Sequence, residues 1–150
     1  MIVAQDMKLV FRLGGMGFSV GVSHVLEILD CGFSDLVLGD APLPRLSLGR
    51  IAHRGWDFEV FDGRRLFDLA PREGRSRLTV LVITVGESPF GLAVDRVQGI
   101  FPGSEFALRP LPPLLAAQEP FPLYQTLDVW RGEPLVVCDV ARMMPVRGGL

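Results

Sequence analysis

Residues 9–28 read LVFRLGGMGFSVGVSHVLEI, and their pattern returns 72 residues later at 81–100 as LVITVGESPFGLAVDRVQGI. Seven of the twenty paired positions are identical, and most of the others keep size or polarity. The identical pairs are Leu9 and Leu81, Val10 and Val82, Gly14 and Gly86, Phe18 and Phe90, Val22 and Val94, Val25 and Val97, and Ile28 and Ile100. A solenoid unit runs about 20 to 50 residues, so this longer period indicates a duplication of a larger unit.

The duplication continues beyond this stretch. Arg54 and Arg131 are each followed by glycine, and an aspartate lies eight residues after each arginine, at Asp62 and Asp139. The shift has grown from 72 to 77 residues, which places five extra residues in the proline-rich loop 110–122. The repeated aspartates predict a shared structural duty, such as bonding the backbone of a turn, with acid or base catalysis as the alternative.

Each copy holds enough sequence for about five short strands, which is a small barrel or sheet. A barrel of about 60 residues buries too little surface to be comfortably stable alone. We therefore expect residues 1–150 to form one domain, built from pseudo-repeats 9–69 and 81–144. These should be two all-β half-domains that lean on each other and superpose.

Strands are predicted where apolar and polar residues alternate, or where short apolar runs are bounded by turn residues. The predicted strands are 8–13, 17–22, 33–38, 48–54, 56–61, 64–69, 78–85, 90–94, 123–130 and 133–140. Ser23 is expected to cap a helix of one or two turns in which Val25 and Ile28 share an apolar face. Asp95 takes the same capping position in the second copy, and Trp56 is expected on the half-buried face of its strand.

The composition argues against nucleic acid and membranes as partners. A net charge of −2 and a pI near 5.6 give no field that would draw the chain to polyanions. The longest nearly apolar run, Leu78–Val85, is far too short for a membrane span, and no signal peptide is evident, so we expect no direct membrane insertion and a cytoplasmic location. Cys31 and Cys138 are far apart in apolar settings, which predicts buried free thiols.

Candidate chemistry is sparse. His24 and His53 have no metal-ligand spacing with the cysteines, and no glycine-rich phosphate motif links a strand to a helix. We therefore expect no metal, cofactor or nucleotide. A small enzyme with Asp57, Asp62 or His53 as acid or base is the alternative that these residues leave open.

An ordered series of motifs spans nearly the whole chain. The motifs are Phe11–Gly14, Phe18–Val22, Val25–Ile28, Gly49–Gly55 after two prolines, Val60–Gly63, and Gly91–Val97. In this order and spacing they resemble the CheW-like domains of bacterial chemotaxis signalling. The resemblance implies an all-β fold of two tandem five-stranded SH3-like barrels, with short helical turns and an apolar groove between the barrels.

The resemblance also implies a non-catalytic adaptor without a cofactor. Its partners would be a CheA-type histidine kinase and the helical tip of a methyl-accepting chemoreceptor, with a scaffold for another motility or regulatory pathway as the alternative. The residues expected to contact protein partners are Val25, Glu27, Ile28, Arg54, Gly91, Val97 and Ile100. Core packing is the alternative role for the apolar members of this set.

Arg54 is the arginine of the family's Arg-Gly motif, which is associated with receptor binding. Its guanidinium could bind a carboxylate of a partner helix, and closing the hairpin is the alternative role. Ala52, His53 and Glu59 depart from the residues usual in the family. We infer a partner surface altered to match.

Overall fold

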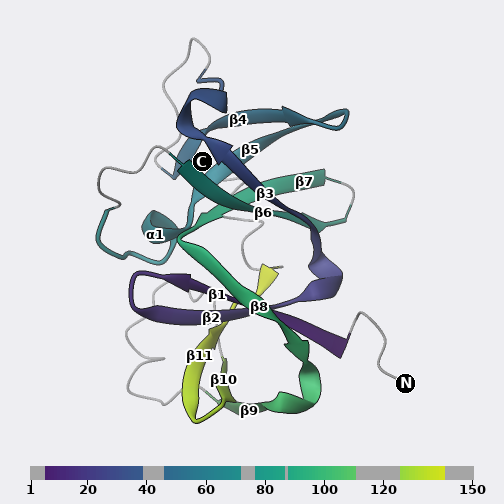
Figure 1. Ribbon diagram of the computed structural model, residues 1–150, viewed down its shortest axis with the longest axis vertical. Coiled ribbons are helices and arrows are strands. Elements are labelled where there is room, and N and C mark those ends of the chain that lie inside the picture. The colour runs from purple at the N-terminus through teal and green to yellow at the C-terminus, as the bar shows by residue number, and fades with distance from the viewer. Residues whose placement is uncertain (1–5, 39–45, 72–76, 87, 111–125, 141–150) are drawn as a thin grey trace.

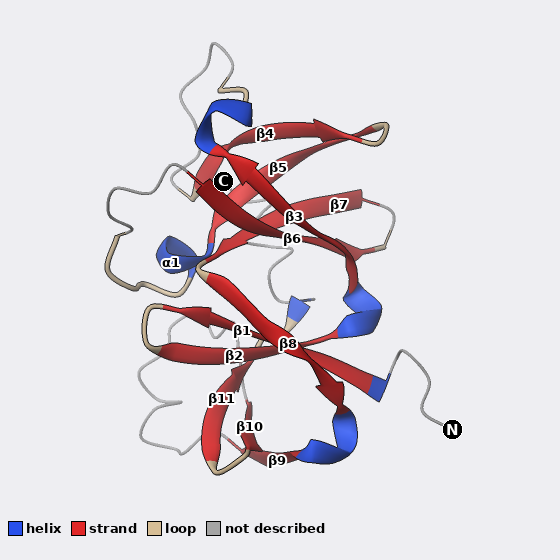
Figure 2. Ribbon diagram, viewed as in Figure 1, coloured by secondary structure: helices blue, strands red, loops and turns tan. Residues whose placement is uncertain are grey.

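The computed structural model describes residues 6–140 apart from 39–45, 72–76, 87 and 111–125. Its strands form two sheets, one above the other in Figure 1, and its helical segments are single turns (Figure 2). The expected all-β class is confirmed. Part of the last predicted hairpin, at 123–125 and 138–140, and most of the proline-rich loop fall outside the described strands or the described residues.

The first sheet contains six strands in the order β8-β1-β2-β11-β10-β9. These are β1 (Met7–Leu13), β2 (Met16–Gly21), β8 (Arg96–Pro102), β9 (Phe106–Pro110), β10 (Thr126–Trp130) and β11 (Glu133–Val137). Strand β9 was not predicted from the sequence, and it adds a sixth strand to the expected five. It pairs with β10 at the edge of the sheet.

The second sheet contains five strands in the order β3-β6-β7-β5-β4. These are β3 (Val25–Gly32), β4 (Ser47–His53), β5 (Trp56–Asp62), β6 (Arg77–Val85) and β7 (Ser88–Val94). A single α-helical turn, α1 (Gly63–Leu66), follows β5.

Each sheet draws strands from both copies of the repeat. The sheet β3-β6-β7-β5-β4 takes its hairpin β6-β7 from the second copy, and the other sheet takes β1-β2 from the first. The expectation that each copy forms its own half-domain is therefore wrong. Its physical cause is the short crossing after each hairpin, through the 3₁₀ turn Val22–His24 and through Asp95, which carries the chain to the other sheet. The duplication itself stays a prediction from the sequence.

Three predicted elements take another form. The segment expected to be a helix after Ser23 is strand β3, and only Val22–His24 forms a 3₁₀ turn. Residues 33–38 contain the 3₁₀ turn Phe33–Asp35 instead of a strand, and residues 64–69 include α1. For β3, the local apolar spacing of three was outweighed by long-range pairing with β6. For the two turns, local bonds to aspartate decide: Gly32 N donates to the Asp35 carboxylate and Arg64 N to that of Asp62.

One hydrophobic cluster is shared by the two sheets. Phe11 stacks on Phe18 with ring centroids 5.2 Å apart, and Phe61 meets Phe90 edge to face at 6.1 Å. The buried members of this shared core are Leu9, Phe11, Leu13, Phe18, Val20, Leu46, Phe61, Leu81, Ile83, Phe90, Leu92, Val94, Val136, Cys138 and Val140. Two smaller clusters fill the inner faces of the individual sheets. Burial of the shared core accounts for why the two sheets form one unit.

Candidate protein-binding surface

Strands β3 and β8 are edge strands of the two sheets, and each carries an exposed isoleucine that faces the shared core. Ile28 lies opposite Leu81, and Ile100 lies opposite Leu9. Directly opposite residues of a strand pair lie on the same face of a sheet. Because Leu81 and Leu9 belong to the shared core, both isoleucines lie on the sheet faces that meet there, yet they are 41% and 46% exposed.

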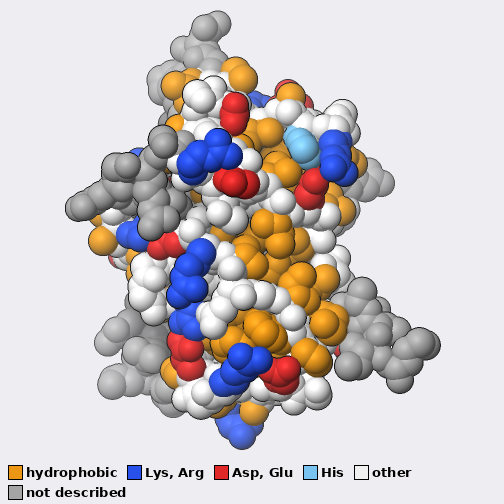
Figure 3. Space-filling view, in the orientation of Figure 1, with side chains coloured by type: hydrophobic (Ala, Val, Ile, Leu, Met, Phe, Trp, Pro, Cys, Tyr) orange, Lys and Arg blue, Asp and Glu red, His pale blue; other side chains and the backbone are white. Residues whose placement is uncertain are grey.

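Two valines lie deeper on the same faces. Val25 is paired with Ile83 and Val97 with Phe11, and both valines are partly buried against the shared core. We call Val25, Ile28, Val97 and Ile100 the inter-sheet strip. Figure 3 shows hydrophobic side chains gathered in the middle of this face, between the sheets and over β8. The expected apolar surface between the two barrels therefore has an exposed rim and a partly buried floor.

A β-bulge in β3 turns the next residue away from the strip. The register of β3 shifts between Val25 and Glu27, and Glu27 then lies opposite Val82, which belongs to the inner cluster of the five-stranded sheet. A bulge adds a residue on one strand and re-aims the side chains that follow. Glu27 therefore faces the interior side of its sheet, at the end where β4 and β5 turn.

At that end Glu27 contacts two neighbouring side chains, the His53 imidazole and the Arg54 guanidinium. His53 Nε2 lies 3.0 Å from Glu27 Oε2, and Arg54 Nη2 lies 3.5 Å from Glu27 Oε1. Arg54 and Gly55 have positive φ angles of 51° and 81°, as a two-residue turn joining twisted strands requires. The Arg54 side chain is 74% exposed. We call Glu27, His53 and Arg54 the turn cluster.

The equivalent turn of the six-stranded sheet lays its arginine over aromatic rings, although its side chain is still 60% exposed. Arg131 also has a φ of 51°, but its guanidinium stacks on Trp130 at 4.6 Å and on Phe101 at 4.8 Å. It also pairs with Glu105 at 3.4 Å. Closing the turn and exposure to solvent are thus common to both arginines, whereas stacking on aromatic rings is found at Arg131.

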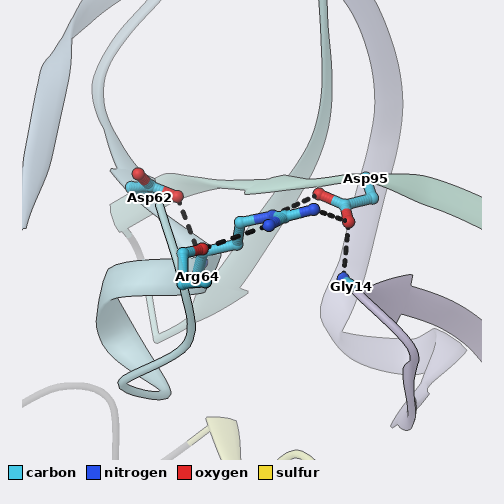
Figure 4. A network of polar contacts seen from close by, with 5 residues as sticks. Gly14, Asp62, Arg64 and Asp95 are labelled. Atoms are coloured by element: carbon cyan, nitrogen blue, oxygen red, sulfur yellow. Dashed lines mark hydrogen bonds and ion pairs between the residues drawn. The ribbon is translucent and has the colours of Figure 1, made fainter. Parts of the chain in front are cut away.

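A polar network beside α1 ties the two sheets together (Figure 4). The Asp95 carboxylate accepts hydrogen bonds from Gly14 N at 2.5 Å and from Arg64 Nε and Nη2 at 3.0 and 2.7 Å. The Asp62 carboxylate accepts from Arg64 N at 3.1 Å, so its predicted duty at a turn is confirmed, while that of Asp139 stays a prediction. The expectation that Asp95 caps a helix is wrong, because strand β8 follows it.

Gly91 does not belong to the surface. It is buried in β7, and an added Cβ would lie 2.8 Å from Val80 Cγ1 and 3.1 Å from Val60 Cγ2. Close packing inside the five-stranded sheet explains the absence of a side chain. Its burial indicates a packing role, and its predicted contact with a partner stays a prediction. Trp56, expected to share the buried face of its strand with Phe58 and Val60, is instead 48% exposed, because it is the first residue of β5 and lies beside the turn.

The sequence did not point to Arg64 or Trp56 as parts of this surface and its support. Arg64 follows Asp62 in a stretch predicted to be a strand, and only the fold brings it to Asp95. Trp56 stood in a pattern of alternation that predicts burial. The sequence feature that could have indicated its exposure is that Trp56 directly follows the Arg54-Gly55 turn, as the first residue of a strand.

The residues considered for catalysis are not assembled. Asp57 pairs with Arg50 at 3.0 Å on the surface, and Asp62 lies at the far end of the β4–β5 hairpin from His53. No group of three or more metal-ligating side chains occurs among the described residues. No described helix is long and apolar enough to cross a membrane.

The two cysteines are not joined in a disulfide, as expected, but they differ in environment. Cys138 is buried, and this burial raises the pKa of its thiol well above the usual value. Cys31 is half-buried rather than buried, because it lies on the edge strand β3; burial, followed by nearby Asp35, raises its pKa as well. A raised pKa keeps a thiol protonated and unreactive at neutral pH.

Comparisons with known proteins agree with this architecture. The family model described as CheW-like domain matches residues 8–147. Among solved structures, the scaffolding protein TtCheW from Thermoanaerobacter tengcongensis is similar, with a TM-score of 0.70 and 18% sequence identity. The match covers 89% of this chain and 88% of that one. A search of curated proteins found no match.

Proposed function

The chain belongs to the CheW-like domain family, and on that premise we propose that it is a non-catalytic adaptor coupling chemoreceptors to a CheA-type histidine kinase in bacterial chemotaxis. The family is one of chemotaxis scaffold proteins. The observation that carries the proposal is the inter-sheet strip, an apolar surface on the edge strands β3 and β8 with an exposed rim. The turn cluster lies at the β4–β5 turn of the five-stranded sheet, which also contains β3. The proposed place of action is the cytoplasm.

The strip suits an amphipathic helix as its ligand. Such a helix lays its apolar face on an apolar surface, and a few charged contacts fix its register. Ile28 and Ile100 supply the apolar rim, and Arg54 supplies an exposed cation that can bind a carboxylate through two parallel hydrogen bonds. We assign this surface to the helical tip of a methyl-accepting chemoreceptor.

The first experiment tests the strip. Binding of a receptor-tip fragment and of the CheA-type kinase from the same organism is measured by calorimetry with the purified protein. Ile28→Ser is expected to weaken receptor binding by about 2 kcal/mol, the range of an interface hot spot. Leu108→Ser is the matched control, because Leu108 is also exposed but lies on β9, away from the strip. Equal losses for both variants would contradict the assignment.

The second experiment uses the two equivalent turns. Arg54→Ala is expected to weaken receptor binding by about 2 kcal/mol or more and to leave thermal stability nearly unchanged, because the side chain is mostly exposed. Arg131→Ala should instead lower thermal stability and leave receptor binding nearly unchanged, because it removes the stacking of the guanidinium on Trp130 and Phe101. A lower melting temperature for Arg54→Ala, without a binding defect in the folded fraction, would assign Arg54 to the fold.

A further inference from the structure

We propose that His53 is a positioning residue that couples protonation to Arg54, so that binding of an acidic partner strengthens as the pH falls from 8 to 6. The inference rests on the proposed function in one respect, namely that Arg54 contacts a carboxylate of the partner. It also deepens that function, because it adds a regulator to the same surface.

The geometry of the turn cluster carries the inference. One carboxylate, that of Glu27, is shared by His53 Nε2 at 3.0 Å and by Arg54 Nη2 at 3.5 Å. With a neutral imidazole, Nε2–H donates a hydrogen bond and Arg54 is the cation that balances the charge of Glu27. With a protonated imidazole, the shorter contact becomes a charge-assisted hydrogen bond, which is the stronger kind. His53 then competes with Arg54 for Glu27.

The charge of the cluster therefore changes by one unit with a single proton. Glu27 and Arg54 together carry no net charge, and protonated His53 makes the cluster a cation. Histidine is the side chain whose ordinary titration falls between pH 5 and 8. A partner carboxylate keeps its charge over the same range. Lower pH thus releases Arg54 from its internal partner and raises the positive charge that the partner meets.

The surrounding charges do not provide the same switch. Arg50 and Asp57 on the same hairpin pair with each other at 3.0 Å, and Asp30 further along β3 pairs with Arg77 at 3.2 Å. The other ionisable groups on these elements are Glu59 and Asp62 on β5, Cys31 on β3 and His24 ahead of β3. His24 is exposed in the 3₁₀ turn Val22–His24, and its contacts do not include Glu27.

The test measures receptor-tip binding at pH 6, 7 and 8 in the full-length protein. The wild type is expected to bind about threefold more tightly at pH 6 than at pH 8, as one partly exposed ion pair can supply. His53→Leu should bind with the same affinity at all three values. His24→Gln is the control for general histidine effects and should keep the pH dependence of the wild type.

A second readout needs no partner. The Nε–H signal of Arg54, assigned with Arg54→Ala, is followed by NMR over the same pH range. It should move in the wild type and in His24→Gln, and stay in place in His53→Leu. A signal that does not move in the wild type overturns the inference, whatever the binding data show.

The two readouts separate failure of the inference from failure of the proposed function. Binding that needs Arg54 but is independent of pH overturns the coupling and leaves the adaptor function standing. An Arg54 signal that follows His53, together with no receptor binding at any pH, supports the coupling within the protein and overturns the assignment of the receptor as partner.

Discussion

Replacing Asp95 with alanine tests the polar network that links the two sheets through Gly14 and Arg64. The Asp95 carboxylate accepts three hydrogen bonds, one from the Gly14 backbone and two from Arg64. The side chains of Arg64 and Asp95 are 19% and 11% exposed, so both charges are largely shielded from water. The variant removes the hydrogen bonds to Gly14 N and to Arg64 together.

The size of the effect follows from this geometry. Truncating one partner of a fully buried ion pair costs about 3 to 5 kcal/mol, whereas an exposed pair contributes less than about 1 kcal/mol. Because Arg64 and Asp95 keep some contact with solvent, we expect Asp95→Ala to lower the free energy of unfolding by about 3 kcal/mol. For a chain of this size that corresponds to a fall of roughly 9 °C in melting temperature.

The assay is urea unfolding followed by circular dichroism, with the midpoint and the m-value fitted separately. Asp57→Ala is the control, because the pair of Asp57 with Arg50 is 3.0 Å long but lies on the surface. The midpoint should fall clearly for Asp95→Ala and hardly at all for Asp57→Ala, with similar m-values. Equal, small shifts for the two variants would refute the view that the network couples the sheets.

Four further outcomes follow from the structure. Thiol labelling of the native protein should modify Cys31 slowly, and faster as the pH rises, while Cys138 should react only after unfolding, since burial raises its pKa; equal rates would contradict this. Gly91→Ala should destabilise the fold by about 2 kcal/mol through overpacking, as thermal unfolding would show, and an unchanged melting temperature would contradict the close packing. The hydrogen bond from Arg12 lowers the pKa of Glu133. The contribution of Glu133 to stability is therefore present above its unfolded-state pKa and is lost as the pH falls through the lower folded-state pKa. Glu133→Gln should flatten the acid side of the curve of unfolding free energy against pH. Fragments made by cutting after residue 76 should each lack near-UV circular dichroism and regain it when mixed, because each sheet needs strands of both.

The sequence predicted correctly those strands whose local alternation of apolar and polar residues agrees with their pairing in the sheet. The hairpin of 8–13 with 17–22 and the strand 56–61 follow from alternation and turn glycines, and the structure has them within one or two residues. The stretch after Ser23 was predicted to be a helix because Val25 and Ile28 lie three residues apart, as on one face of a helix. A strand that contains a bulge gives the same spacing. The bulge at Leu26 breaks the alternation that would have indicated a strand.

For the candidate surface, the motifs selected both exposed and buried residues. Ile28 and Arg54 belong to the motifs and Ile100 to the repeat, and all three side chains are exposed, while their contact with a partner stays a prediction. Gly91 sits in the same motif as Val97 but is buried, since a motif does not tell which of its residues serve the fold. Contacts between distant segments, such as that of Arg64 with Asp95, carry no local signal at all.

The exchange of hairpins between the copies explains why the strip is made of equivalent positions. Ile28 and Ile100 are one repeat apart, and so are their cross-strand partners Leu9 and Leu81, which exchange places: Ile28 lies opposite Leu81 and Ile100 opposite Leu9. If each copy had formed its own sheet, Ile28 would have paired with Leu9. Because the pairing crosses between copies, each edge strand is fixed to a hairpin of the other copy, and the shared core runs beneath both isoleucines. The duplicated apolar position therefore produces two rims of one surface, which a single copy could not supply.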